Sequence, residues 1–483
     1  MINKILNKYL FFAVFLITSV FSTAVVPSAL AHAASGGTIG TWQTQANSLP
    51  TNLLAADSVT YDGYVYVLGG YDGNGPVNLV FSAQVDSNGN VGEWNGMGNT
   101  PLPIPLFGSS AIAYNGYIYI IGGGATNNTL SGAQTVFSAP ISSGTVGPWT
   151  QLDSSLPSSL LFQTAVESDG YVYVMGGLSD AQNTPPSNVV FSAQLNSDGT
   201  LGQWTTQANS LPDTSFLSTS VVYDGYIYLF GGQNSQSPTN AVYSAPITNG
   251  TVGSWSTTQS LPAPLWASTS VLYNGKVYLL GGADNSSNRQ NTVYSASLTN
   301  GEVGQWTNET NSLPQALAFS TATVANGYVY VLGGGESDGI SFISNTVYSA
   351  QLYIKVLSQS ANALANTKNT VTILSNAIDT PDPSSLVLLT QPTHGSATAS
   401  TSGIVYTPTS GYIGEDSLTY KICSTLASYR CSLVTLHLLV AVQPPNTGVG
   451  VTLDSPLTTL LNYSIASITF IGAALLVRKK YQL

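Results

Sequence analysis

Hydrophobic and polar residues alternate in short runs between residues 39 and 352, and this pattern predicts β-strands rather than helices. In one stretch, runs 111–114 and 117–121 are rich in β-branched and aromatic residues and flank Asn115-Gly116. Asn-Gly readily adopts positive φ at both central positions of a type I′ turn, so these segments predict a β-hairpin. A third run at 136–139 and a fourth that carries Trp149 complete a four-stranded unit.

This unit occurs six times with constant internal spacing. In each copy a proline precedes the glycine of an Asp-Gly or Asn-Gly turn by 13 residues, and a Gly-Gly pair begins six residues after that glycine. The whole unit recurs every 50 to 55 residues. A period near 50 with glycine pairs is typical of a β-propeller. The turn glycines are Gly63, Gly116, Gly170, Gly225, Gly275 and Gly327.

The two ends of the repeat region complement each other. The sixth unit ends at 348–352 with no tryptophan strand after it, whereas a strand-like run at 39–42, ending in Trp42, precedes the first unit. We predict that the Trp42 strand is the outermost strand of the sixth unit. This pairing removes an open sheet edge that would otherwise pair with other chains.

The glycine pair after the second strand, the aromatic residue in the third and the tryptophan in the fourth resemble the kelch repeat, and the resemblance covers 39–352. It implies an all-β fold, a six-bladed kelch-like β-propeller. Kelch propellers serve as binding scaffolds and, in a few bacterial and fungal relatives, as enzymes, so the fold implies only a site on one face. The loops between the second and third strands vary most in length, and we expect the site on their face.

An apolar residue lies nine positions before each turn glycine, near the predicted entrance of the central channel. Packing that plugs the channel mouth is the usual role of such a periodic side chain. The functional alternative is an aromatic platform for sugar rings or apolar peptide side chains. On that reading the ligand-binding residues are Trp266, Phe107 and Phe216, and Trp266 is the only tryptophan outside the repeat register. The full set is Leu54, Phe107, Leu161, Phe216, Trp266 and Ala318.

Few residues of the predicted propeller suit catalysis. None of the three histidines of the chain lies in it, and its only cations are Lys276 and Arg289. The copper-radical oxidases of this fold need His, Tyr and a cross-linked Cys, and sialidase-like propellers need an arginine cluster, so neither site can be assembled. We therefore predict no catalytic residue and no cofactor. Carboxylates that could still hydrolyse a glycosidic bond as a pair are Asp57, Asp153, Glu167 and Asp213.

Both chain ends carry processing or anchoring signals. Lys4 and Lys8 precede an apolar run with small-x-small cleavage sites, which predicts a secretory signal peptide at 1–33. Residues 457–477 are uncharged and long enough at about 1.5 Å per residue to cross a membrane as a helix. The basic tail 478–483 would then stay in the cytoplasm.

The pentapeptide Pro444-Pro445-Asn446-Thr447-Gly448 precedes that span. Together with the apolar segment and basic tail it resembles the cell-wall sorting signal of Gram-positive-type surface proteins, usually Leu-Pro-any residue-Thr-Gly. Here Pro444 replaces the leucine. The resemblance implies that a sortase-type transpeptidase cleaves after Thr447 and joins its carboxyl to the cell envelope. Simple membrane retention is the alternative.

Residues 356–442 show short strand-like runs separated by turn signals and closely resemble a bacterial immunoglobulin-like or cadherin-like module. The resemblance implies a small β-sandwich. The only two cysteines of the chain, Cys423 and Cys431, fall on the two arms of its last predicted hairpin, and in an exported protein we expect them to form a disulfide.

Two groups of acids raise the question of calcium. Residues 86–90 resemble the start of a calcium loop, but Asp-x-Asn-Gly is also a common hairpin turn. In the sandwich, Asp379, Asp382 and Asp416 could bind calcium as in some cadherin-like relatives, or could serve turns and packing. We predict no metal site.

Between residues 34 and 447 the chain has six basic and 21 acidic residues, so nucleic acid is excluded as a partner. We predict a secreted protein anchored to the cell wall or membrane on the extracellular face. The leading function is a non-enzymatic binding protein or adhesin whose propeller meets an extracellular glycan or protein ligand. The alternatives are an exported carbohydrate-active enzyme and a structural envelope protein.

Overall fold

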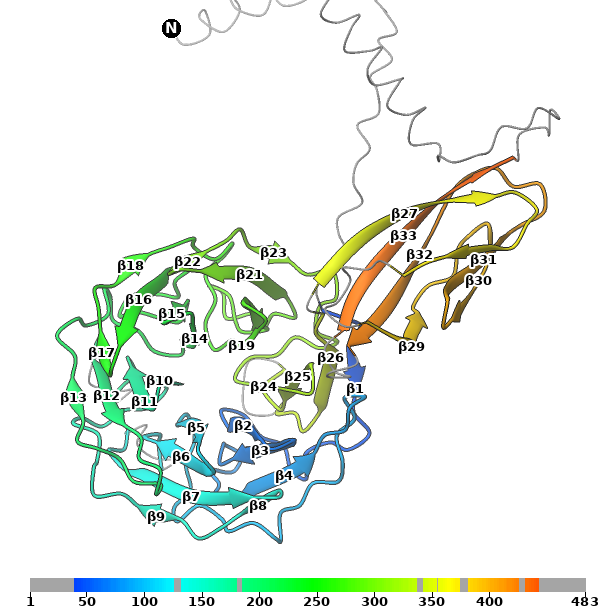
Figure 1. The fold of residues 1–483 in the computed structure, drawn as a ribbon. Helices are drawn as coiled ribbons and strands as arrows, with labels where there is room; N and C mark the ends of the chain where they lie inside the picture. The colour runs from blue at the N-terminus through cyan, green and yellow to red at the C-terminus, as the bar shows by residue number, and fades with distance from the viewer. Residues whose placement is uncertain are drawn as a thin grey trace, which may run out of the picture.

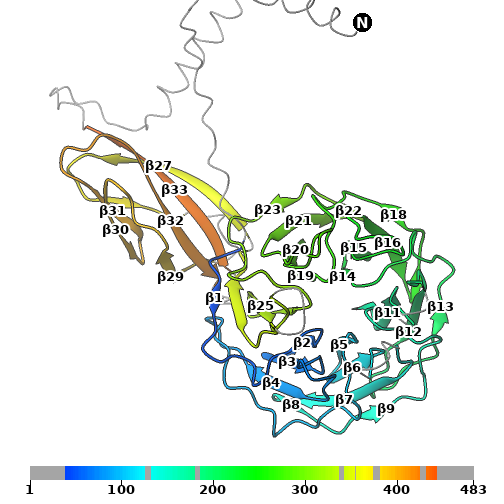
Figure 2. The same cartoon turned by 180° about the vertical axis from the view of Figure 1, so that it is seen from behind.

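The computed structural model describes residues 39–125, 132–179, 185–336, 342–353, 355–373, 381–424 and 431–442. These residues form strands and no helix. Six antiparallel sheets surround a central axis, and a smaller two-sheet domain projects from the ring beside β1 and β26 (Figures 1 and 2). We call residues 39–353 the sheet ring and the smaller domain the sandwich.

Each predicted repeat forms one sheet, numbered here 1 to 6 along the chain, with its first strand nearest the axis. Sheet 1 contains β2 (Asp57–Tyr61), β3 (Tyr64–Leu68) and β4 (Val80–Gln84). Sheet 2 contains β5 (Ser110–Tyr114), β6 (Tyr117–Ile121), β7 (Val136–Ser142), β8 (Thr145–Val146) and β9 (Thr150–Gln151). Sheet 3 contains β10 (Thr164–Ser168), β11 (Tyr171–Met175), β12 (Val190–Gln194) and β13 (Thr205–Thr206).

The other three sheets repeat this arrangement. Sheet 4 contains β14 (Thr219–Tyr223), β15 (Tyr226–Phe230), β16 (Val242–Thr248), β17 (Thr251–Val252) and β18 (Ser256–Thr257). Sheet 5 contains β19 (Thr269–Tyr273), β20 (Lys276–Leu280), β21 (Val293–Thr299), β22 (Glu302–Val303) and β23 (Thr307–Asn308). Sheet 6 contains β24 (Thr321–Ala325), β25 (Tyr328–Leu332), β26 (Val347–Gln351) and β1 (Gln43–Thr44).

The predicted closing strand is confirmed. β1 pairs antiparallel with β26, with Gln43 opposite Ser349, and Ile39 bridges Leu352. The indole N–H of Trp42 donates to the carbonyl of Asn311 at 3.0 Å. The tryptophan of each other sheet makes the same bond to a carbonyl in the segment that leads into the first strand of its sheet. The N-terminal strand therefore occupies the outer position of sheet 6.

The glycine pairs dock each sheet on the next. The N–H of Gly282 donates to the carbonyl of Leu317 in the following sheet at 2.7 Å, and the N–H of Gly334 donates to Leu53 at 2.8 Å, which returns the series to sheet 1. A Cβ on Gly281 would overlap the Leu317 carbonyl oxygen, and Gly281 has a φ of 60°. Only glycine tolerates both the close approach and this backbone conformation without strain.

The sandwich consists of two sheets packed on a shared apolar core. The first has the order β27 (Lys355–Leu364), β33 (Cys431–Ala441), β32 (Gly414–Ser424) and β29 (Pro381–Leu388), with β27 parallel to β33. The second has the order β28 (Asn369–Val371), β31 (Gly403–Pro408) and β30 (Gly395–Ser400). Cys423 and Cys431 form a disulfide between β32 and β33.

Within the part of the chain that the structure describes, no helix is long and apolar enough to cross a membrane. The predicted signal peptide 1–33, sorting motif 444–448, membrane span 457–477 and tail 478–483 lie outside the described residues.

Candidate functional site

The variable loops between second and third strands emerge beside the start of each first strand. Phe107 bridges Gly124, Phe216 bridges Gln233 and Trp266 bridges Ala283, and in each case the second residue directly follows a Gly-Gly pair. The apolar residues predicted at the channel mouth therefore lie on the same face as the loops between second and third strands.

In each repeat, the residue directly after this apolar position takes part in a closed circle of six backbone hydrogen bonds around the axis. Each N–H donates to the carbonyl of the corresponding residue in the preceding sheet at 2.8–3.0 Å, and Ala55 closes the circle by donating to Phe319. All six residues have positive φ, between 49° and 57°, which is uncommon for residues other than glycine. We call this circle the mouth ring: Ala55, Gly108, Phe162, Leu217, Ala267 and Phe319.

Two phenylalanines of the mouth ring meet across the axis. Phe162 comes from sheet 3 and Phe319 from sheet 6, and the first strands of neighbouring sheets contact one another in sequence around the ring, so these two sheets lie on opposite sides. Their ring centroids are 6.1 Å apart. Both side chains are half-buried. The pair therefore spans the axis, and each side chain keeps part of its surface accessible.

Further aromatic side chains surround this pair. Phe107 contacts Phe162 edge to face at 5.7 Å and Tyr71 at 6.1 Å, while Trp266 contacts Phe319 edge to face at 5.7 Å. These geometries are the favourable ones for aromatic pairs. We call the five residues the aromatic plug: Tyr71, Phe107, Phe162, Trp266 and Phe319.

Arg289 covers one side of the aromatic plug. Its Cζ atom lies 5.8 Å from the ring centroid of Trp266 and 5.5 Å from that of Phe319, within range of a cation–π interaction. It is the only arginine of the sheet ring. A positive charge therefore stands beside an otherwise apolar surface.

The three predicted ligand-binding residues differ in their accessibility. Trp266 is 9% exposed and its indole N–H donates to the carbonyl of Asp284 at 3.0 Å, and Phe107 is 6% exposed. Phe216 is half-buried, and among the described residues no ring contact joins it to the aromatic plug. The structure thus brings Trp266 and Phe107 together through Phe162 and Phe319.

Phe162 and Phe319 directly follow the predicted channel-mouth positions of their repeats, and the repeat pattern does not predict a role for them. Their positive φ cannot be inferred from their identity, because phenylalanine rarely adopts it. A usable signal did exist. Phenylalanine occupies this position in the third and sixth repeats only, and these repeats face each other in a closed ring of six.

The four candidate acids occupy different environments. Asp57 begins β2 and accepts a hydrogen bond from the Ser109 hydroxyl of sheet 2, and burial raises its pKa to about 7. Burial also raises the pKa of Glu167, which is in β10 and accepts the Gly170 N–H at 3.1 Å.

The Asp213 carboxylate accepts hydrogen bonds from Thr214 and Asn234 at the surface. Asp153 lies in the connection after β9. Asp57 and Glu167 stand six and three residues before their turn glycines, at different heights along the axis.

The aspartates considered for calcium are engaged by protein donors. Asp86 accepts the N–H groups of Asn88 and Asn90 at 2.8 Å, as in a hairpin turn. Asp416 accepts hydrogen bonds from three backbone N–H groups and, at 2.8 Å, from the Tyr406 hydroxyl.

Asp382 accepts hydrogen bonds from both the N–H and the hydroxyl of Ser384, as a turn residue does. Asp379 lies outside the described residues. Within the described ranges no three His, Cys, Asp or Glu side chains are grouped as metal ligands.

Known proteins resemble this chain in its two folded parts. Residues 162–366 match the family model described as the KLHDC2/KLHL20/DRC7 Kelch-repeats domain, and residues 355–436 match a bacterial Ig domain. Beta-scruin of Limulus polyphemus is 26% identical over 178 residues, which are 37% of this chain and 19% of that protein. Spermatocyte protein spe-26 of Caenorhabditis elegans is 34% identical over 87 residues, 18% of this chain and 14% of that protein. The chain thus spans less than a fifth of either relative.

The solved structure of YjhT superposes on the chain with a TM-score of 0.51 at 14% identity, covering 62% of this chain and 95% of that chain. At this identity the likeness shows the fold alone. The chain therefore carries a kelch-repeat domain with a propeller-like fold, followed by a bacterial immunoglobulin-like domain.

Proposed function

We propose that the protein is a cell-surface binding protein or adhesin, built as a six-bladed kelch-like propeller on a sandwich stalk. The kelch-repeat scaffold is suited to binding. The observation that carries the proposal is the contact of Phe162 with Phe319 across the axis, because it leaves half-buried aromatic surface at the centre of the face where the variable loops emerge.

The chemistry of this face suits a ligand with an apolar side and polar substituents. Aromatic rings pack against the C–H face of a sugar or against an apolar peptide side chain. Phe342, in the connection between β25 and β26, is 59% exposed on this face. Arg289 places a positive charge beside the rings. We therefore propose an extracellular glycan or protein as the ligand, with Trp266 and Phe107 supporting the half-buried rings of Phe162 and Phe319 through edge-to-face contacts.

Surface attachment is part of the proposal and rests on the sequence. The signal peptide brings the chain out of the cell, and the motif ending at Thr447-Gly448 with the following apolar segment directs it to a sortase-type transpeptidase or retains it in the membrane. The sandwich then stands between the anchor and the sheet ring.

Glycan and peptide arrays probed with the purified chain test the binding function. We expect a restricted set of positive spots, with signals lost in the Phe162→Ala/Phe319→Ala double variant and retained in Tyr61→Ala. Tyr61 is a matched control because it is a half-buried aromatic residue at the other end of its first strand, beside the hairpin turn. Turnover of a bound glycan would favour the enzyme alternative. Absence of any signal from the native chain would favour a structural envelope protein.

A further inference from the structure

The sheet ring and the sandwich meet at a short, buried joint. β26 ends at Gln351 and β27 begins at Lys355, so three residues connect the two domains. Leu352 is fully buried and bridges Ile39 of the closing N-terminal segment, and Tyr353 is 7% exposed. Figure 1 shows the ends of β32 and β33 beside β1 and β26 at this point.

Tyr353 contacts both domains. On the ring side a Cβ at Gly40 would lie 3.3 Å from the Tyr353 hydroxyl oxygen, which is tighter than ordinary packing, so the glycine allows the tyrosine to lie against the N-terminal segment. On the sandwich side Tyr353 forms a buried apolar cluster with Cys423 and Cys431, against which Leu433 packs. The side chain is therefore wedged between the closing segment and the disulfide.

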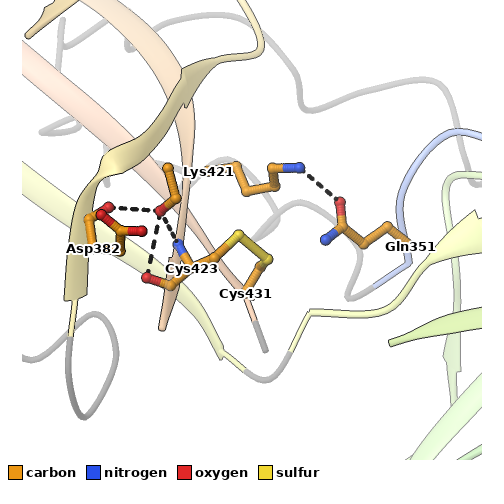
Figure 3. The surroundings of a disulfide bond; sticks show 6 residues. Gln351, Asp382, Lys421, Cys423 and Cys431 are labelled. Atoms are coloured by element: carbon orange, nitrogen blue, oxygen red, sulfur yellow. Dashed lines mark hydrogen bonds between the residues drawn. A yellow bond between two sulfur atoms is a disulfide. The ribbon is translucent and has the colours of Figure 1, made fainter. Parts of the chain in front are cut away.

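The disulfide forms the sandwich side of this joint. Figure 3 shows it near Lys421 and Asp382. Cys423 and Cys431 are 4% and 0% exposed and face each other at the ends of β32 and β33. The backbone N–H of Cys423 donates to the Ser385 hydroxyl at 2.8 Å, and that hydroxyl donates to the carbonyl of Asp382 at 2.6 Å. The disulfide thus joins two strands at the joint, and Ser385 ties a third strand, β29, to the same place.

A second contact crosses the joint beside the disulfide. The Lys421 ammonium donates to the side-chain carbonyl of Gln351 at 3.3 Å (Figure 3). Lys421 is half-buried, and loss of solvation lowers its pKa. The backbone carbonyl of Gln351 accepts the N–H of Gly40 at 2.8 Å, so one residue links the closing segment, the last strand of sheet 6 and the sandwich.

We propose that the Cys423–Cys431 disulfide is a lock on the interdomain joint, which holds the sheet ring at a fixed angle to the sandwich. Two domains joined by a small interface move relative to each other by default. Here the disulfide keeps the ends of β32 and β33 together as a wall for Tyr353, and the three-residue connection leaves little slack. The inference concerns the joint alone and does not depend on the ligand of the aromatic plug.

Distance measurements on the full-length protein test the lock. Spin labels at Ser197→Cys, in the connection between β12 and β13, and at Thr401→Cys, in the turn between β30 and β31, report the interdomain distance by pulsed electron resonance, and both positions are exposed. We expect one narrow distance distribution in the otherwise native chain. In the Cys423→Ser/Cys431→Ser variant we expect the distribution to broaden by about twofold or more while circular dichroism and melting show both domains folded.

A narrow distribution in the folded double-serine variant would overturn the proposal, and so would a broad one in the native chain. If the double-serine variant fails to fold, Tyr353→Ala decides, because it removes the wedge and keeps the disulfide. Broadening in Tyr353→Ala supports the lock, and an unchanged narrow distribution contradicts it. Tyr412→Ala is the matched control, a partly buried tyrosine of the sandwich whose ring stacks on His394, and it should leave the distribution narrow.

Discussion

Asp57 should make the stability of the sheet ring depend on pH, and Asp57→Asn should remove that dependence. The five equivalent positions hold serine or threonine, so Asp57 is the one carboxylate among the six equivalent positions. Burial between sheets 1 and 2 raises its pKa from 3.8 to about 7, and the hydrogen bond from Ser109 only partly opposes this rise.

The sign and size of this pH dependence follow from the linkage between proton binding and folding. Because its pKa is higher in the folded than in the unfolded state, the protonated carboxyl stabilises the fold below about pH 4, and this stability is lost as pH rises through about 7. A rise in pKa from 3.8 to about 7 corresponds to about 4 kcal/mol, and the free energy of unfolding should fall by about 1.4 kcal/mol per pH unit within this window. Asp72 and Asp86, whose pKa values are lowered by hydrogen bonds, act with the opposite sign and only below about pH 4.

Urea unfolding between about pH 5 and 8, followed by tryptophan fluorescence, measures this effect. All seven tryptophans precede residue 307, so their fluorescence reports on the sheet ring and not on the sandwich. Asp57→Asn should flatten the pH profile and be more stable than the native chain above pH 7. Asp57→Ser, which restores the hydroxyl of the other repeats, should behave in the same way. An unchanged pH slope in both variants would refute the reasoning.

Three further changes test the fold and the anchor. Deletion of residues 36–43 should expose the outer edge of sheet 6 and cause aggregation or loss of the cooperative transition, and an unchanged melting curve would contradict closure by β1. Trp266→Ala should lower the free energy of unfolding by about 3 to 5 kcal/mol in calorimetry, because the indole is buried and bonded to Asp284; a loss well below this range would contradict a packing role. Thr447→Ala should move the protein from the envelope-linked to the detergent-extractable membrane fraction, and no shift would indicate plain membrane retention.

The repeat architecture could be predicted because its signals are local. Asp62 and Gly63 adopt φ values of 48° and 78°, as the hairpin pattern requires, and every other turn glycine also has positive φ. The glycine pairs and the tryptophans then recur because each makes the same contact with a neighbouring sheet. The unpaired segment around Trp42 was sufficient to predict closure, since an open edge is a liability in any sheet.

The composition of the site could not be predicted in the same way. Phe162 and Phe319 are far apart in sequence and reach each other only because positive φ turns both residues at the mouth ring. The raised pKa of Asp57 depends on the depth of the seam between two sheets, which the sequence does not specify. The packing of Tyr353 on the disulfide likewise depends on how two domains meet, and neither domain encodes it alone.

The affinity of the aromatic plug for its ligand is the most direct test of the central claim. Isothermal titration of the strongest glycan or peptide from the arrays should show that Phe162→Ala/Phe319→Ala weakens binding by about 1 to 3 kcal/mol, as expected for aromatic anchors, while the propeller stays folded. Tyr61→Ala should bind as tightly as the native chain. Unchanged affinity in the folded double-alanine variant would contradict a binding site at the mouth ring and leave the aromatic plug as packing alone.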